Sequence, residues 1–202
     1  MRVRTEARRR AILDAARAVF EEEGFDRATM SAISQRLGGS KATLYGYFAS
    51  KEELFVACLE EEIAAQTGEL VAGMRAIPDL RQALMHLGRE FLTSVTGDRP
   101  IAVQRMVATQ PRDSRIGLNF YERGLKPSWL RLCVYLEEQM AAGRLREANA
   151  WVMAMHLKGL LEGEFVERRM LNAIPAQLDA ATVERTTKDA VDVFLRAYGP
   201  EA

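Results

Sequence analysis

The segment from Thr29 to Phe55, TMSAISQRLGGSKATLYGYFASKEELF, constrains the fold of this chain more than any other stretch. Apolar residues recur at helical spacing on both sides of Gly38-Gly39, which predicts two short helices separated by a sharp turn. In the second helix, over 40–48, Leu44 and Phe48 form one apolar face, and the other positions are small, basic or aromatic. This layout is typical of a helix-turn-helix, whose second helix enters the major groove of DNA.

The residue types around this turn suit contact with DNA. Short side chains at the start of the second helix let the backbone approach base edges, while hydroxyl and ammonium groups can donate to phosphates. Thr29 can cap the first helix and reach a phosphate from its N-terminus. The predicted DNA-binding residues are Thr29, Ser40, Lys41, Ala42, Thr43, Tyr45, Tyr47 and Lys51. The alternative is a plain helical hairpin with a glycine turn and a partly buried pair of tyrosines.

The string Ser40-Lys41-Ala42-Thr43-Leu44-Tyr45-Gly46-Tyr47-Phe48, followed by Ser50-Lys51-Glu52-Glu53-Leu54-Phe55, resembles the signature of the tetracycline-repressor-like (TetR/AcrR) family of bacterial transcription regulators. The upstream run Arg10-Ala11-Ile12-Leu13-Asp14-Ala15-Ala16 shares this likeness. Gly46 departs from the His or Asn that the family often has between the two aromatic residues. A looser likeness to the family's AefR-like C-terminal domain rests on Pro111-Arg112 and Phe120-Tyr121-Glu122-Arg123-Gly124.

The resemblance implies an all-α fold with two domains. An N-terminal three-helix helix-turn-helix domain is expected at 1–50, and a larger ligand-binding and dimerisation domain at 51–202. The resemblance also implies a homodimer on a palindromic double-stranded DNA operator. A small-molecule effector would release that DNA, and repression is the family's usual mode. No cofactor or metal is implied.

Charge is distributed unevenly along a chain whose formal net charge is zero. Residues 1–51 hold ten Lys and Arg against six Asp and Glu, whereas the remainder holds 18 against 22. A basic region followed by an acidic one concentrates the attraction for DNA at one end. The chain has no long uncharged apolar run and no apolar stretch behind its charged start. We therefore expect no membrane span and a cytoplasmic protein.

Helical periodicity continues through nearly the whole chain. Ser50 with Glu53 and Asp79 with Gln82 have the spacing of helix-capping pairs, so helices are expected to begin after Ser50 and Asp79. The predicted helices after the first four cover about 79–95, 99–109, 114–122, 125–142, 149–172 and 179–198. Proline- and glycine-containing segments supply the breaks.

Aromatic and methionine residues gather in the middle of the chain and suggest a sensor cavity. Side chains of these types usually belong to a core, but as a set they can also line a ligand site between helices. The residues predicted to bind an apolar or aromatic effector are Phe91, Met106, Phe120, Tyr121, Trp129, Cys133, Trp151 and Met155.

The last two predicted helices suit a dimer interface, which the resemblance places there. Small residues let helices approach closely, and the predicted interface residues are Gly159, Gly163, Val166, Val191, Phe194 and Leu195. The alternative is packing within one chain only.

Other classes of function receive little support. The chain has two His and two Cys, with no CxxC, HExxH or complete phosphate-binding loop, so an enzyme is not expected. A regulator controlled by a protein partner, with no small ligand, remains an alternative. Cys58 and Cys133 are predicted to be buried thiols, with a redox-sensing pair as the alternative.

Overall fold

The computed structural model describes residues 5–175 and 177–200. The described part of the chain is helical and holds no strand, which confirms the all-α class. None of its helices is both long enough and apolar enough to cross a membrane. Arg2 and Arg4, which count toward the basic charge of residues 1–51, lie outside the described residues.

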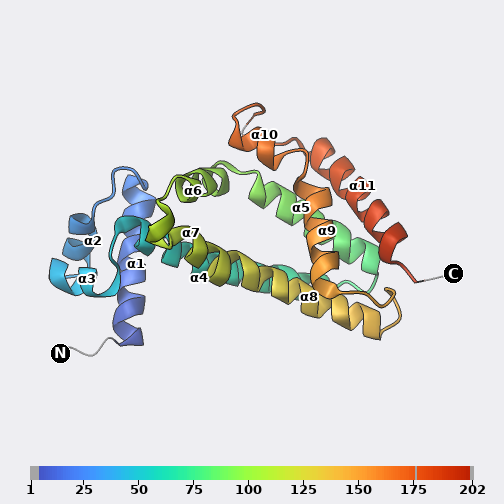
Figure 1. The fold of residues 1–202 in the computed structure, drawn as a ribbon, viewed down its shortest axis with the longest axis horizontal. Coiled ribbons are helices and arrows are strands. Elements are labelled where there is room, and N and C mark those ends of the chain that lie inside the picture. Colours follow the sequence, from blue (N-terminus) through green and yellow to red (C-terminus); the bar gives the residue numbers. More distant parts are fainter. Residues whose placement is uncertain (1–4, 176, 201–202) are drawn as a thin grey trace. The chain divides into compact units, whose positions relative to one another are not determined.

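The helices labelled in Figure 1 follow most of the predicted spans. They are α1 (Glu6–Glu23), α2 (Met30–Arg36), α3 (Lys41–Tyr47), α4 (Lys51–Arg75), α5 (Leu80–Val95), α6 (Asp98–Ala108), α7 (Ile116–Asn119), α8 (Lys126–Ala141), α9 (Ala150–Glu162), α10 (Val166–Met170) and α11 (Ala180–Tyr198). A 3-10 turn, Arg112–Ser114, precedes α7, and a π-helical turn, Phe120–Leu125, follows it.

Two segments that were each predicted as one continuous helix are interrupted in the structure. The span 149–172 is broken after Glu162, and Phe165, which lies between α9 and α10, is buried in a small cluster with Leu92 and Val183. The span 114–122 is not one α-helix either. Arg115 has a left-handed backbone with φ of 58°, and the π-helical turn begins at Phe120. Neither feature leaves a periodic signal in the sequence.

The chain folds as two compact units. The first unit holds the described residues up to Ile63 together with Arg112–Leu125, and the second holds Ala64–Pro111 and the described residues from Lys126 onward. α4 therefore continues from one unit into the other, whereas the sequence prediction placed a single division after residue 50. The first unit also takes in a segment from the middle of the chain.

The core of the first unit joins α1, α2, α3 and the beginning of α4. α1 contributes a fully buried stripe that includes Ile12, Leu13 and Ala16. Phe55 on α4 packs against Phe20 and Phe25, with ring centroids 4.9 and 4.7 Å away. The predicted cap at Ser50 is confirmed, because its Oγ accepts from the Glu53 backbone N–H at 3.1 Å.

The second unit is built mainly from α5, α8, α9 and α11, which bury a larger apolar core. Asp79 caps α5 as predicted, since its side chain accepts from the Gln82 backbone N–H at 2.8 Å. α5 and α11 approach closely at Gly88, where an added Cβ would lie 2.5 Å from Cγ2 of Thr187. The close packing of α5 against α11 therefore depends on the absence of a side chain at Gly88.

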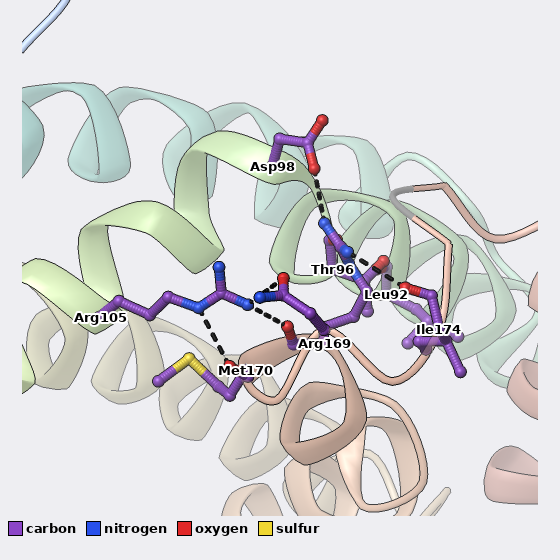
Figure 2. Close-up of polar contacts among 8 residues, drawn as sticks. Leu92, Thr96, Asp98, Arg105, Arg169, Met170 and Ile174 are labelled. Atoms are coloured by element: carbon purple, nitrogen blue, oxygen red, sulfur yellow. Dashed lines mark hydrogen bonds and ion pairs between the residues drawn. The ribbon is translucent and has the colours of Figure 1, made fainter.

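A buried arginine ties α10 to the junction of α5 and α6 (Figure 2). Arg169 is 5% exposed, and its guanidinium donates to the Thr96 carbonyl at 2.8 Å and to the Asp98 carboxylate at 2.6 Å. Arg105 on α6 donates in the opposite direction, to the carbonyls of Met170 at 3.0 Å and Arg169 at 2.5 Å. We call these contacts the α6–α10 clamp.

Candidate nucleic-acid interface

Side-chain caps and a glycine fix the turn between α2 and α3. Oγ1 of Thr29 accepts from the Ala32 backbone N–H at 3.1 Å, and Oγ of Ser40 accepts from that of Thr43 at 3.2 Å. Gly38 has φ of +64°, a conformation that side-chain-bearing residues rarely adopt. The two helices are therefore held at a defined turn, as the sequence predicted.

The short helix α3 has one face inside the unit and one outside. Leu44 is fully buried and Phe48, which ends the helix, is 5% exposed. On the other side the predicted DNA-binding residues Thr29, Ser40, Lys41, Ala42 and Tyr45 are exposed, while Thr43, Tyr47 and Lys51 are partly buried. The helix thus presents a polar N-terminal surface without exposing its apolar anchor.

Lys41 makes no ion pair with the described residues, unlike Arg36 and Arg17 of the same unit. Arg36 forms two hydrogen bonds with the Glu22 carboxylate, both of 2.6 Å. Arg17 donates to Glu61 at 2.5 Å. The side chain of Lys41 is exposed at the first position of α3, so its ammonium is available to a phosphate.

Two predicted DNA contacts already have roles within the unit. Nζ of Lys51 donates to the carbonyl of Phe25 at 2.8 Å and lies 4.4 Å from the centre of that ring. The Tyr47 hydroxyl accepts from the Thr5 backbone N–H at 3.0 Å. Both side chains thus make contacts within the unit, which the sequence motif alone did not reveal. A contact of either with DNA stays a prediction.

Arg8 lies beside the turn and was not among the predicted site residues. An added Cβ on Gly39 would fall 2.7 Å from a terminal guanidinium nitrogen of Arg8. The only sequence signal for this placement was the basic run Arg8-Arg9-Arg10.

The residues predicted to bind an effector are divided between the two units. Phe120 and Tyr121 belong to the first unit, whereas the other six belong to the second. In the second unit the rings of Phe91 and Trp129 meet edge to face with centroids 5.2 Å apart. Cys133 is buried in the main core, against which Phe91, Trp129, Trp151 and Met155 also pack. Met106 lies partly buried on α6.

Both cysteines are buried free thiols, as predicted. Burial raises the pKa of Cys58 to about 12 and also raises that of Cys133. Both thiols are therefore protonated and unreactive near neutral pH.

The residues predicted for a dimer interface face in different directions. Val191 and Phe194 are fully buried in the core of their own chain. Gly159 and Gly163 are exposed, and Val166 and Leu195 are partly buried. α11 turns Val193 outward instead, with 46% exposure. The interface formed by these residues stays a prediction.

A groove of about 410 Å³ lies on α9 and α11. It is lined by Met155, His156, Gly159, Leu160, Val193, Phe194, Ala197 and Tyr198. Within it the His156 ring nitrogen Nδ1 and the Tyr198 hydroxyl are hydrogen-bonded at 2.5 Å. This mainly apolar groove is exposed on α9 and α11, and the sequence did not predict it.

Comparisons with known proteins agree with this architecture. Residues 12–58 match the family of bacterial regulatory proteins, tetR family, and residues 82–200 match the C-terminal domain of AefR-like transcriptional repressors. The chain is 31% identical to the transcriptional repressor AcnR of Corynebacterium diphtheriae over 194 residues, covering 96% of this chain and 94% of that protein. It is 28% identical to the regulator BetI of Rhizobium meliloti, covering 95% and 91%.

Among solved structures, the flavonoid-responsive regulator FrrA is similar, with a TM-score of 0.68 and 29% identity over 98% of this chain and 100% of that one. The matched residues include α2, α3 and the turn between them, and the chain from the first turn of α5 to the end of α11. The chain therefore belongs to the tetR family of bacterial transcription regulators, with an AefR-like C-terminal domain.

Proposed function

We propose that this protein is a repressor that binds a palindromic operator as a dimer and releases it when a small effector binds. The observation that carries the DNA-binding part is the surface of α3, where a capped N-terminus presents Ser40, Lys41 and Thr43. The unpaired charge of Lys41 suits a phosphate, and the short side chains beside it suit close approach to base edges.

The groove on α9 and α11 supports the dimer. Leu160 and Val193 expose apolar surface there, with exposed fractions of 37% and 46%. A second copy of the same groove would cover them, and two-fold symmetry would place two reading helices on successive half-sites. We therefore assign the partner surface to the outward positions of α9 and α11.

Sedimentation velocity tests this interface. Leu160→Glu would place a charge in the groove and should convert the dimer to a monomer. Leu171→Glu is the matched control, because Leu171 is 70% exposed but does not line the groove. A dimer that survives Leu160→Glu unchanged would move the interface elsewhere.

The effector is proposed to be apolar or aromatic and to bind in the second unit. Partly buried aromatic side chains, among them Phe91, Trp129 and Trp151, supply suitable surface. The similarity to FrrA, a protein described as flavonoid-responsive, supports an aromatic class of compound. Because Trp129 and Trp151 are the two tryptophans of the chain, quenching of intrinsic fluorescence by a saturating compound would report binding.

Capture of sheared source-genome fragments by the purified protein at near-physiological salt tests the central proposal. A palindromic sequence enriched by the wild type is expected, and saturating effector should lower its affinity roughly 5–150-fold. Absence of enrichment even at low salt would overturn the DNA-binding role of α3.

A further inference from the structure

The first unit contains a small cavity of about 100 Å³ apart from the exposed surface of α3. Its walls come from α1, the end of α3, α4, α7 and the π-helical turn. The lining residues are Arg9, Tyr47, Phe48, Glu53, Val56, Ala57, Glu60, Ile116, Asn119 and Arg123. All of them belong to one compact unit.

The charge of the Glu60 carboxylate is only partly compensated in this cavity. The side chain is partly buried, and it accepts no hydrogen bond from the described residues. Burial raises the pKa of this carboxyl, and the positive charges of Arg123 and Arg9 only partly oppose that effect. A carboxylate in this environment is stabilised by a cation that comes close to it.

The other charged groups of the wall, apart from Arg123, already have partners. Arg9 pairs with Glu61 at 3.4 Å, and its guanidinium lies over the Phe48 ring at 5.8 Å from the centroid. Glu53 accepts a hydrogen bond of 2.7 Å from the Ala49 backbone N–H. Glu60 therefore remains as the negative group that a ligand can satisfy.

The segment opposite α4 supplies a positive group and an amide. Arg123 and the side chain of Asn119 form no hydrogen bond or ion pair with another described residue, although the charge of Arg123 is felt at Glu60. Both lie on the part of the chain that combines the left-handed Arg115 with a π-helical turn. Turns of this kind are rare and occur frequently at functional sites.

We infer that this cavity binds a small zwitterion, whose primary ammonium pairs with Glu60 and whose carboxylate is received by Arg123 and Asn119. The opposite charges of Glu60 and Arg123 match the two ends of such a ligand. A volume of about 100 Å³ limits it to the size of a small amino acid, since one water needs about 10–15 Å³ by the same measure.

Through Tyr47 and Phe48, the cavity lies next to the end of α3. Tyr47 is the last residue of α3 and Phe48 its C-terminal cap, and both line the cavity. A bound zwitterion would thus contact the end of α3 without touching its exposed N-terminal surface. This site is separate from the effector region proposed in the second unit and does not depend on it.

Isothermal titration calorimetry of the full chain, without DNA, tests the site directly. Glycine, L-alanine and L-serine serve as zwitterionic probes, and ethylamine and propionate as the two halves of alanine. Saturable binding of at least one zwitterion is expected, with an affinity at least tenfold above that of either half. No saturable binding of any zwitterion to the wild type, or equal affinity for ethylamine, would overturn the inference.

Substitutions then locate the site. Glu60→Gln should weaken the binding of the best zwitterion at least tenfold, and Arg123→Gln should weaken it without weakening the binding of ethylamine. Glu69→Gln, an exposed position on the same helix outside the cavity, should bind as the wild type does. If Glu60→Gln alters folding, Glu60→Ala replaces it, and wild-type affinity in that variant would contradict the role of Glu60.

Discussion

The two units support the surfaces of α3 and α11 in different ways. In the first unit, α3 has seven residues and is fastened by the fully buried Leu44, the cap at Ser40 and the neighbouring Phe48. In the second unit, α11 has 19 residues and buries a whole face against α5 and α9. A surface on a short helix depends on very few contacts, whereas a surface on a long packed helix shares its support among many. Single substitutions should therefore have sharper effects in the first unit.

The strongest test of this contrast is Leu44→Ala. Removing a fully buried leucine should lower the free energy of unfolding by about 3 kcal/mol and detach α3, so DNA binding should be lost. Urea unfolding and a fluorescence-anisotropy titration with a captured DNA fragment would measure the two effects. Tyr45→Ala, at a position 52% exposed on the same helix, should change stability by less than about 0.5 kcal/mol. Equal losses of folding stability in the two variants would contradict the anchoring role of Leu44.

In the second unit, the α6–α10 clamp also depends on a single side chain, that of Arg169. Arg169→Gln removes guanidinium hydrogen bonds to Thr96 and Asp98 from a buried position, which should cost about 2 kcal/mol of folding stability. The neighbouring Arg168 is the control, because it pairs with Glu164 in an exposed (i, i+4) contact of 3.1 Å. Arg168→Gln should cost no more than about 0.5 kcal/mol. If the two variants unfold at the same urea concentration, the buried contacts of Arg169 contribute no more to folding stability than the exposed pair of Arg168.

At the α5–α11 contact, a single substitution should raise the folding stability instead of lowering it. Oγ1 of Thr187 is buried and has no hydrogen-bond partner among the described residues. Thr187→Val replaces the hydroxyl by a methyl group and should stabilise the protein by about 1 kcal/mol. Gly88→Ala should act in the opposite direction, because its Cβ would meet the same side chain. Destabilisation by Thr187→Val would show that the hydroxyl has a partner in solution.

Much of this contrast was visible in the sequence, but not equally for both units. The turn, its caps and the exposed face of α3 depend on residues close together in the chain, so spacing around Gly38 predicted them. The partners of Lys51 and Tyr47 lie 26 and 42 residues away, and no local pattern reveals such contacts. The orientation of Val191, the break before Phe165 and the cavity around Glu60 likewise depend on tertiary packing.

On DNA, the first unit should show the effect of a single exposed charge. Lys41→Ala should weaken binding to a captured fragment about fivefold and reduce the slope of log affinity against log salt by about 0.9, as loss of one phosphate contact does. Lys188→Ala in the second unit is the control, since Lys188 pairs with Asp192 at 2.7 Å on α11. An unchanged salt slope in Lys41→Ala would remove Lys41 from the phosphate contacts.

The smallest effect is expected from acid titration of α11. Hydrogen bonds from Lys188 and Arg81 lower the pKa of Asp192 to about 2. Because the folded pKa lies below the unfolded value of about 4, the stabilisation is present above that pH and is lost as the pH falls toward 2. Asp192→Asn should therefore flatten the acid limb of the stability curve, measured by urea unfolding between pH 5 and about 2. Asp189→Asn, at an exposed position on the same helix, should leave that limb unchanged.

Photo-crosslinking tests the assignment of α3 as the DNA-reading element most directly. A photoreactive side chain at position 43 should crosslink to bases of the enriched sequence in a captured fragment, at matched positions in its two halves. The same group at position 171, an exposed site in the second unit, should give no crosslink. Crosslinks from position 171 with none from position 43, at saturating protein, would contradict the account.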